Sequence, residues 1–232
     1  TDFVANISHE LKTPVGALAV LAEALSQEDD LDIIHRLSDK MVDEAIRVGR
    51  TIDDLLELSR IEFGGEAVKD EVDAGAIISE SILRVSPLAS AHSIKVEMIE
   101  LATPLKVVGD RRQLVSAIGN LVENAVKYSE IGSAVEVSAQ ADGDSVEFTV
   151  KDFGLGIPSR DLDRVFERFY RVDRARSRDT GGTGLGLAIV RHVANNHGGD
   201  VSVTSIEGEG STFSLKIPKF VSQNPVTMKE SA

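Results

Sequence analysis

The chain has 232 residues, a formal net charge of −13 and no cysteine. This length predicts one or two domains, and the hydrophobic content of 42% is sufficient for packed cores. The lack of cysteine excludes disulfides and thiolate metal sites and fits a reducing compartment. The acidic charge argues against DNA or RNA as the main partner, because a negatively charged surface repels the phosphate backbone.

Apolar side chains in residues 1–63 recur at spacings of three and four, which predicts two long helices. The acidic stretch 28–30 lies between them, so we expect a short connection and an antiparallel pair. Two helices alone bury little surface, and this apolar seam therefore predicts a dimer that forms a four-helix bundle. The seam positions are Phe3, Ile7, Leu11, Leu18, Leu21 and Leu25, then Ile34, Leu37, Met41, Ala45, Val48, Ile52 and Leu55.

The pattern changes to mixed helices and strands after Gly64-Gly65 and a charged linker that runs to about Val72. Asp110 is the expected N-cap of a helix over 111–128, with Gln113 as its capping-box partner. Asp142-Gly143-Asp144 predicts the turn of a hairpin. We expect further helices over 74–90 and 185–196, and strands over 94–99, 134–141, 146–152, 201–205 and 212–217.

His9 lies among polar residues beside the apolar seam and is expected to face solvent. A neutral imidazole has a free ring nitrogen that can attack a phosphoryl group. Glu10 could hold or remove the other ring proton, and Thr13 lies four residues on, on the same helix face. Pro14 loosens the helix one turn later. Taken alone, this pattern is also typical of a solvated surface histidine beside a kink.

The predicted helix 111–128 has an unusual polar face that carries Asn120, Asn124, Lys127 and Tyr128. Amide oxygens are hard ligands that suit Mg²⁺, which binds few protein groups and prefers phosphate and water. The lysine can neutralise phosphate, and the tyrosine offers a flat surface to a base. A solvated helix face is the alternative interpretation.

Two glycine-rich segments follow. Asp152 ends a predicted strand before Gly154, Gly156 and Ile157, and a buried carboxylate there could accept from an exocyclic amine and select adenine. The second segment precedes a predicted helix, where free backbone N–H groups can hold phosphate. Between the two, Phe166, Phe169 and Tyr170 could anchor a segment that begins at Arg171, whose side chain could reach a γ-phosphate. The second segment comprises Gly182, Thr183, Gly184, Leu185 and Gly186.

Five segments in this order resemble the conserved boxes of sensor histidine kinases, over about residues 1–217. Within that family, the first segment and the preference for Arg over Lys resemble the phosphate-regulon sensor kinases of actinobacteria. Lys12 departs from the Arg that many relatives carry. The segments are FVANISHELKTP (H box), NLVENAVKYS (N box), DFGLGIP (first glycine box), FERFYR (F box) and GGTGLGL (second glycine box).

The resemblance implies an α+β protein. A dimerising two-helix hairpin precedes an α/β-sandwich ATP-binding domain of the gyrase, chaperone, histidine-kinase and MutL superfamily. It implies that His9 is the phosphoacceptor, Glu10 the assisting base and Thr13 the residue that places water for dephosphorylation. We expect domains at 1–66 (dimerisation and histidine phosphotransfer) and 67–221 (catalytic ATP-binding), and a disordered tail at 222–232.

The resemblance also assigns the nucleotide site. Asn124 resembles the Mg²⁺ ligand, with Asn120 assisting, and Asp152 the acid that reads adenine. ATP-hydrolysing relatives carry a glutamate where this chain has Asn120, so transfer to His9 is favoured over hydrolysis. By position, Lys127 and Arg171 resemble the phosphate contacts, Tyr128 the adenine wall, and Gly182, Gly184 and Gly186 the lid glycines.

The expected activity is autophosphorylation by ATP and transfer to an aspartate in the receiver domain of a response regulator, with phosphatase activity towards that regulator. We expect the chain to be the cytoplasmic part of a protein that a preceding segment anchors in the cell membrane. Three alternatives remain open from the sequence: a nucleotide-binding scaffold, net phosphatase action, and a serine kinase or ATPase of the same superfamily. The last alternative leaves residues 1–14 unexplained.

Overall fold

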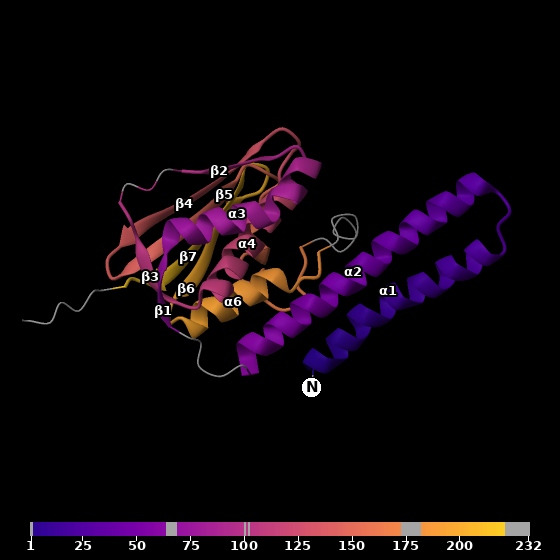
Figure 1. The fold of residues 1–232 in the computed structure, drawn as a ribbon, viewed down its shortest axis with the longest axis horizontal. Helices are drawn as coiled ribbons and strands as arrows, with labels where there is room; N and C mark the ends of the chain where they lie inside the picture. Colours follow the sequence, from indigo (N-terminus) through magenta and orange to yellow (C-terminus); the bar gives the residue numbers. More distant parts are fainter. Residues whose placement is uncertain (1, 64–68, 100, 102, 173–181, 221–232) are drawn as a thin grey trace, which may run out of the picture. The chain divides into compact units, whose positions relative to one another are not determined.

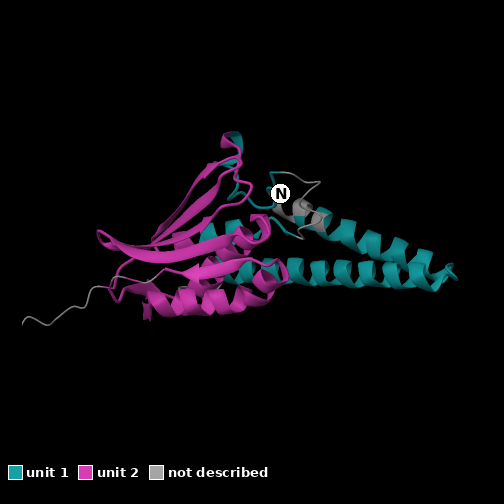
Figure 2. Cartoon of the chain, turned by 90° about the horizontal axis from the view of Figure 1, so that it is seen from above, with its two compact units in different colours: residues 1–65, 160–192 teal, residues 66–159, 193–232 magenta. Residues whose placement is uncertain are grey.

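The computed structural model describes residues 2–63, 69–99, 101, 103–172 and 182–220 (Figure 1). The chain forms two compact units, residues 1–65 with 160–192 and residues 66–159 with 193–232 (Figure 2). The centre of the predicted linker and the predicted tail both lie outside the described residues. The division into domains at residue 66 stays a prediction.

The first unit contains the predicted pair of helices, which run side by side and antiparallel (Figure 1). α1 spans Asp2–Ser26 and α2 spans Leu31–Phe63. Asp30 caps α2, because its Oδ1 accepts the N–H groups of Asp32 at 2.9 Å and Ile33 at 3.3 Å. The spacing of apolar residues thus predicted both helices, and the acidic stretch 28–30 predicted the short turn between them.

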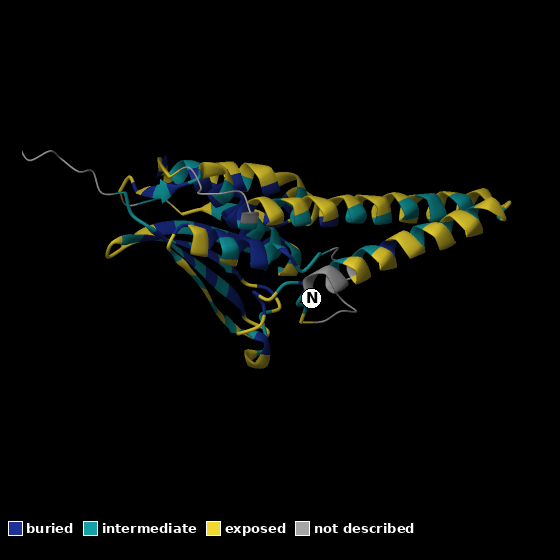
Figure 3. Cartoon of the chain, turned by 90° about the horizontal axis from the view of Figure 1, so that it is seen from below, coloured by how far each residue is buried: buried dark blue, intermediate teal, exposed yellow. Residues whose placement is uncertain are grey.

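Along the hairpin many residues are exposed (Figure 3). Several of them carry large apolar side chains. Near the end of α2 the apolar side chains of Leu58 and Ile61 are buried. Exposed apolar surface of this extent on a helix pair indicates a binding surface. The exposed residues are Val15, Val20, Leu31, Val42, Ile46, Ile52 and Leu56.

The second unit is built on a five-stranded sheet with the order β2-β4-β5-β7-β6. β2 is parallel to β4, and the other neighbours are antiparallel. The hairpin predicted around Asp142-Gly143-Asp144 is confirmed as β4–β5, and the two predicted strands 201–205 and 212–217 form a second hairpin, β6–β7. The strands are β2 (Lys95–Met98), β4 (Ala134–Asp142), β5 (Ser145–Asp152), β6 (Asp200–Ile206) and β7 (Gly210–Pro218).

Helices α3 (Ala74–Ala91) and α4 (Arg111–Tyr128) pack against each other and cover one face of this sheet (Figure 1). Every second residue of β5 is buried, and the last of these is Asp152. This alternation places Val146, Phe148 and Val150 beneath the helices. The predicted fold class, a helical hairpin followed by an α/β sandwich, is confirmed.

Two short strands were not predicted. β1 (Asp70–Asp73) and β3 (Lys106–Gly109) form an antiparallel pair. The sequence indicated a charged linker up to about Val72 and predicted no element at β3. Each strand has four residues, too few for an alternating pattern to stand out. Val72 and Val107 pair directly and are both buried.

The N-terminus of α4 differs from the prediction in one contact. Asp110 is the N-cap, since its Oδ1 accepts from the N–H groups of Arg112 and Gln113 at 2.8 and 3.1 Å. In a capping box, the Gln113 side chain would accept the N–H of Asp110. That N–H instead donates to Nε2 of His197 at 2.9 Å, and Gln113 Oε1 is buried without a partner among the described residues.

His197 directly follows α6 (Gly186–Asn196), and the geometry of that helix end fixes its ring. Gly198 has φ +67° and donates to the Asn195 carbonyl, while Gly199 donates to the Ala194 carbonyl. This is a Schellman ending. A Cβ on Gly109 would lie 2.4 Å from the ring, so only glycine leaves room for His197.

The contacts of His197 require the neutral ring, because Nε2 accepts from Asp110 and Nδ1 lies 2.7 Å from the Val193 carbonyl. Burial lowers the pKa of His197 below its usual value. As the pH falls below about 6.5, the unfolded chain binds a proton that the folded chain excludes, so the free energy of unfolding decreases.

We therefore expect the melting temperature of the wild-type chain to fall between pH 7.5 and pH 5.5. His197→Gln keeps an acceptor for the Asp110 N–H but does not titrate, so its melting temperature should depend less on pH. Circular dichroism measures both. His192, whose pKa burial also lowers, is common to both proteins, so equal pH dependences would contradict the role given to His197.

Candidate functional site

His9 lies in α1 with its side chain exposed to solvent, as the sequence predicted. The hydroxyl of Thr13, one turn on, donates to the backbone carbonyl of His9 at 3.2 Å. α1 continues through Pro14. The side chain of Glu10 lies outside the described residues, so its assignment as the assisting base stays a prediction. An exposed imidazole on a regular helix is accessible to a second reactant.

The polar face of α4 is confirmed. Asn120 and Asn124 are half-buried one turn apart, and Tyr128 is exposed at the end of the helix. Lys127 Nζ lies 2.6 Å from Glu123 Oε1, one turn earlier on the same helix. This ion pair gives the ammonium group of Lys127, whose side chain is 10% exposed, a partner within the helix. On the opposite face, Leu114, Ile118, Leu121, Val122 and Ala125 are buried in the core.

Asp152 ends β5 as a buried carboxyl group, 5% exposed. Its Oδ1 accepts the N–H of Gly154 at 3.0 Å and the N–H of Ser211 at 3.2 Å. Burial raises the pKa of Asp152, and the hydrogen bonds from Gly154 and Ser211 oppose this rise. A carboxyl group buried on backbone amides rather than on Lys or Arg is a strong candidate for ligand recognition.

The loop that follows Asp152 is packed closely against its own chain. A Cβ on Gly154 would lie 2.0 Å from the carbonyl oxygen of Tyr128, and one on Gly156 2.1 Å from that of Ile206. Gly156 also has φ +65°, a conformation that favours glycine. The backbone N–H of Ile157 donates to the Ser205 hydroxyl at 2.7 Å. Both glycines are therefore required by the fold, whatever they contact in a ligand.

The second glycine segment belongs to the first unit. Gly184 has φ +73°, Leu185 is buried, and Gly186 begins α6. The hydroxyl of Thr183 accepts the N–H of Leu185 at 3.2 Å and donates to Asp54 of α2 at 2.6 Å. Thr183 thus caps the start of α6. Gly182 is half-buried.

The aromatic segment before Arg171 is anchored in the same unit, as predicted. Phe166 and Phe169 are buried, and the N–H of Phe169 donates to the Gly184 carbonyl at 2.8 Å. Phe169 has φ +61°, a strained value for a bulky residue. The aromatic segment and the glycine segment therefore meet in one backbone contact, and the half-buried Arg171 follows directly.

Tyr170 makes a second anchor that the sequence did not reveal. Its hydroxyl donates to Asp161 at 2.7 Å, and the Arg164 guanidinium lies over its ring at 4.2 Å from the centroid. Asp161 raises the pKa of Tyr170, since its carboxylate binds the phenolic proton. Asp161 is buried at the end of the short helix η1 (Ser159–Asp161), and no local pattern marked it as a partner.

Two domain families match the chain. The His Kinase A (phospho-acceptor) domain matches residues 1–64, and the histidine kinase-, DNA gyrase B- and HSP90-like ATPase matches residues 109–220. A mycobacterial sensor histidine kinase, MprB, has a solved structure that is 34% identical, with a TM-score of 0.57. The match covers 66% of this chain and 98% of that chain. The chain belongs to the sensor histidine kinases.

Curated relatives agree. Sensor-like histidine kinase SenX3 of Mycolicibacterium smegmatis is 50% identical over 94% of this chain and 57% of its own length. Phosphate regulon sensor protein PhoR of Pseudomonas aeruginosa is 37% identical over 91% of this chain and 48% of its own length. The chain thus spans about half the length of these relatives. Among the described residues, no helix is both long and apolar enough to cross a membrane.

The donor set on α4 fits a magnesium ion held together with a nucleotide. The described residues contain no group of three His, Asp or Glu side chains that could hold a metal by themselves. Asn120 and Asn124 instead present two amide groups one turn apart on a half-buried face. Mg²⁺ commonly keeps water and phosphate as most of its ligands, so two neutral oxygens are sufficient protein ligands.

The substitution Asp152→Asn should affect ATP binding and the stability of the fold differently. The raised pKa of Asp152 means that ionisation of the folded chain is unfavourable, so the free energy of unfolding falls as the pH rises above the usual carboxyl value. At pH 7.5 the neutral amide should leave the melting temperature unchanged or raise it. It should weaken ATP binding by about tenfold or more, because a donor replaces an acceptor in a buried site.

Asp144→Asn in the exposed β4–β5 turn makes the same charge change and is the matched control. Calorimetric titration with ATP and thermal melts of the three proteins provide the comparison. Unchanged ATP affinity in Asp152→Asn would remove Asp152 from the recognition site.

Proposed function

We propose that this chain catalyses ATP-dependent phosphorylation of His9 and passes the phosphoryl group to an aspartate of a response regulator. The observation that carries the proposal is the presence in one chain of two features. His9 is exposed on a phospho-acceptor hairpin, and Asp152 is a buried, amide-bound carboxyl group in an ATPase-type domain. Neither feature alone supports a kinase.

The first step is in-line attack by a ring nitrogen of His9 on the γ-phosphorus of ATP. An N–P bond forms, the P–O bond to ADP breaks, and the proton on the other ring nitrogen passes to Glu10. In the second step a carboxylate oxygen of the regulator attacks the phosphorus, an O–P bond forms and the N–P bond breaks. The imidazole leaves as its other ring nitrogen regains the proton from Glu10. Both transfers depend mainly on positioning and charge neutralisation. Because His9 is exposed, each partner can approach it in turn.

The nucleotide-holding residues follow the family pattern. Asn124, assisted by Asn120, would hold Mg²⁺, which neutralises phosphate charge when bound. Tyr128, exposed at the end of α4, is suited to stack on adenine. The carboxylate of Asp152 would accept the exocyclic amine. We assign the phosphates to Lys127, Arg171 and the backbone of the second glycine segment, Gly182, Thr183, Gly184, Leu185 and Gly186.

We further propose that the functional form is a homodimer through residues 1–66. Support comes from the exposed apolar residues of α1 and α2, which a second hairpin would cover in a four-helix bundle. Burial of such side chains is worth roughly 25 cal/mol per Å² of apolar area. A receiver domain of a response regulator is the proposed second partner.

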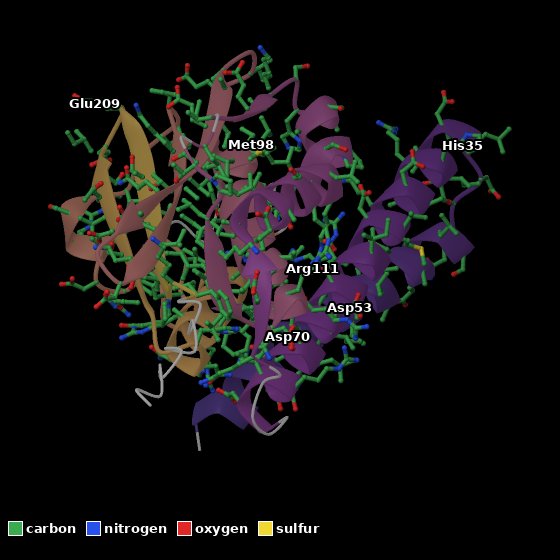
Figure 4. The ribbon with its side chains drawn as sticks, turned by 60° about the vertical axis from the view of Figure 1, so that its left-hand side comes forward. His35, Asp53, Asp70, Met98, Arg111 and Glu209 are labelled. Carbon is green, nitrogen blue, oxygen red and sulfur yellow. The ribbon has the colours of Figure 1, made fainter. Side chains whose placement is uncertain are left out.

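His9→Ala is expected to abolish incorporation of the γ-phosphate of ATP, because no other group in the proposed mechanism accepts it. The matched control is His35→Ala, which removes an exposed histidine of α2 (Figure 4) and should label as the wild type does. Labelling with γ-³²P-ATP followed by acid and base treatment measures this, since phosphohistidine is labile in acid and stable in base. Equal labelling of His9→Ala and the wild type would exclude the proposal.

Phosphatase activity towards the regulator is a second candidate function, supported by the exposed hydroxyl of Thr13 one turn from His9. We expect Thr13→Ala to slow loss of phosphate from the regulator by about tenfold, in the range of one lost positioning contact. Autophosphorylation should stay near the wild-type rate, and Thr13→Ser should retain both activities. Time courses of regulator dephosphorylation and of His9 labelling test this. Equal slowing of both reactions in Thr13→Ala would reject the division of roles.

A further inference from the structure

The turn between β6 and β7 is bound to the loop that follows Asp152. Figure 4 labels Glu209 in this turn. The N–H of Gly208 donates to the carbonyl of Leu155 at 2.8 Å. Gly156 approaches the carbonyl of Ile206 so closely that a Cβ would lie 2.1 Å from it. The two segments therefore behave as one packed structure, although about fifty residues of sequence separate them.

The hydroxyl of Ser205 makes the central contact between them. It accepts the N–H of Ile157 at 2.7 Å and donates to the carbonyl of Gly210 at 2.7 Å. The hydroxyl of Ser211 lies 3.1 Å away. A hydroxyl has one proton and two lone pairs, so these three contacts use its full capacity when Ser211 is the donor of the third. Ser205 thus joins the far end of the loop to the start of β7.

The start of β7 in turn fixes the near end of the loop. The N–H of Ser211 donates to Asp152 Oδ1 at 3.2 Å. Gly210 has φ +118°, and a Cβ on it would lie 2.2 Å from the carbonyl oxygen of Asp152. The direction of the Asp152 carboxyl group therefore depends on where Gly210 and Ser211 lie, and Ser205 binds both of these residues.

We propose that Ser205 is a positioning residue for adenine recognition. It holds loop 152–157 and the start of β7 in one arrangement, which directs the carboxylate of Asp152 towards the exocyclic amine of the base. This inference rests on the proposed function of Asp152. It adds a residue on β6 that touches neither phosphate nor base and acts through Asp152.

Ser205→Ala leaves the N–H of Ile157 and the carbonyl of Gly210 without their partner. A partly buried polar group without a partner is costly, so the loop should shift to find new partners, and the carboxylate should lose its fixed direction. The loss should therefore fall on ligands that carry the 6-amine. Inosine triphosphate has a carbonyl oxygen at that position, so it gains nothing from the carboxylate.

The test compares dissociation constants for ATP and inosine triphosphate, measured by calorimetry on the full chain with Mg²⁺. We expect Ser205→Ala to weaken ATP binding by about three- to tenfold, in the range of one lost hydrogen bond, and to leave inosine triphosphate binding within about twofold. Ser205→Thr keeps the hydroxyl and should restore the preference for ATP. Ser202→Ala, an exposed serine of the same strand, is the matched control.

Equal weakening of both nucleotides in Ser205→Ala would overturn the proposal, because it indicates a general effect on the fold. A preference for ATP unchanged from wild type would overturn it as well. If the wild type itself shows no preference for ATP over inosine triphosphate, the proposed role of Asp152 in reading adenine is wrong. This result differs from the two above, in which the wild type prefers ATP.

Amide hydrogen exchange in the nucleotide-free protein provides a second measurement. Faster exchange at Ile157 and Ser211 is expected in Ser205→Ala but not in Ser205→Thr, while core amides of β5 keep their protection. Unchanged protection at Ile157 would contradict the hydrogen bond on which the inference depends. This measurement requires no ligand, so it tests the positioning contact even if the proposed function is wrong.

Discussion

The buried carboxyl group of Asp152 is the constraint on which the α/β unit depends. Taking an ionised carboxylate out of water costs several kcal/mol, and hydrogen bonds to a charged acceptor return about 1.5–3 kcal/mol each. Two backbone amides make such bonds here, from Gly154 and Ser211. These amides come from segments that are far apart in the sequence. The carboxylate can be retained in the core only while both segments keep their places.

The need to keep these two segments in place explains the glycines around Asp152 better than ligand binding alone does. At Gly154, Gly156 and Gly210 the backbone lies so close to another segment of the chain that a side chain would not fit. Their close packing lets short loops contribute amides to one buried acceptor. The glycines and the serines of β6 and β7 therefore act together, and the hydrogen bonds that they place on Asp152 reduce the cost of burying its charge.

The sequence predicted long regular elements well because periodicity accumulates over many residues. The expected bounds of α4 match those of the structure, and its polar face was visible in the spacing of Asn120 and Asn124. Contacts between segments that are far apart in the chain produce no periodic pattern in the sequence. His197 accepts the N–H of Asp110, a role that the local pattern gave to Gln113. Asp161 accepts from the hydroxyl of Tyr170. In both cases tertiary packing selects the acceptor, and sequence spacing alone does not. β1 and β3 were too short for their alternating pattern to be recognised in the sequence.

The two units differ in what completes them. The α/β unit satisfies its own core, since β5 and α4 bury their apolar faces within it. The helical hairpin leaves Val15, Val42 and Ile46 about half exposed or more, and the proposed dimer would cover such side chains. A phosphoacceptor on such a hairpin need not be rigidly attached to the ATP-binding unit, because His9 is exposed and the reaction needs only a transient encounter. An α/β unit that buries its own core and an exposed histidine on a separate hairpin are therefore compatible with serving two reactants at one histidine.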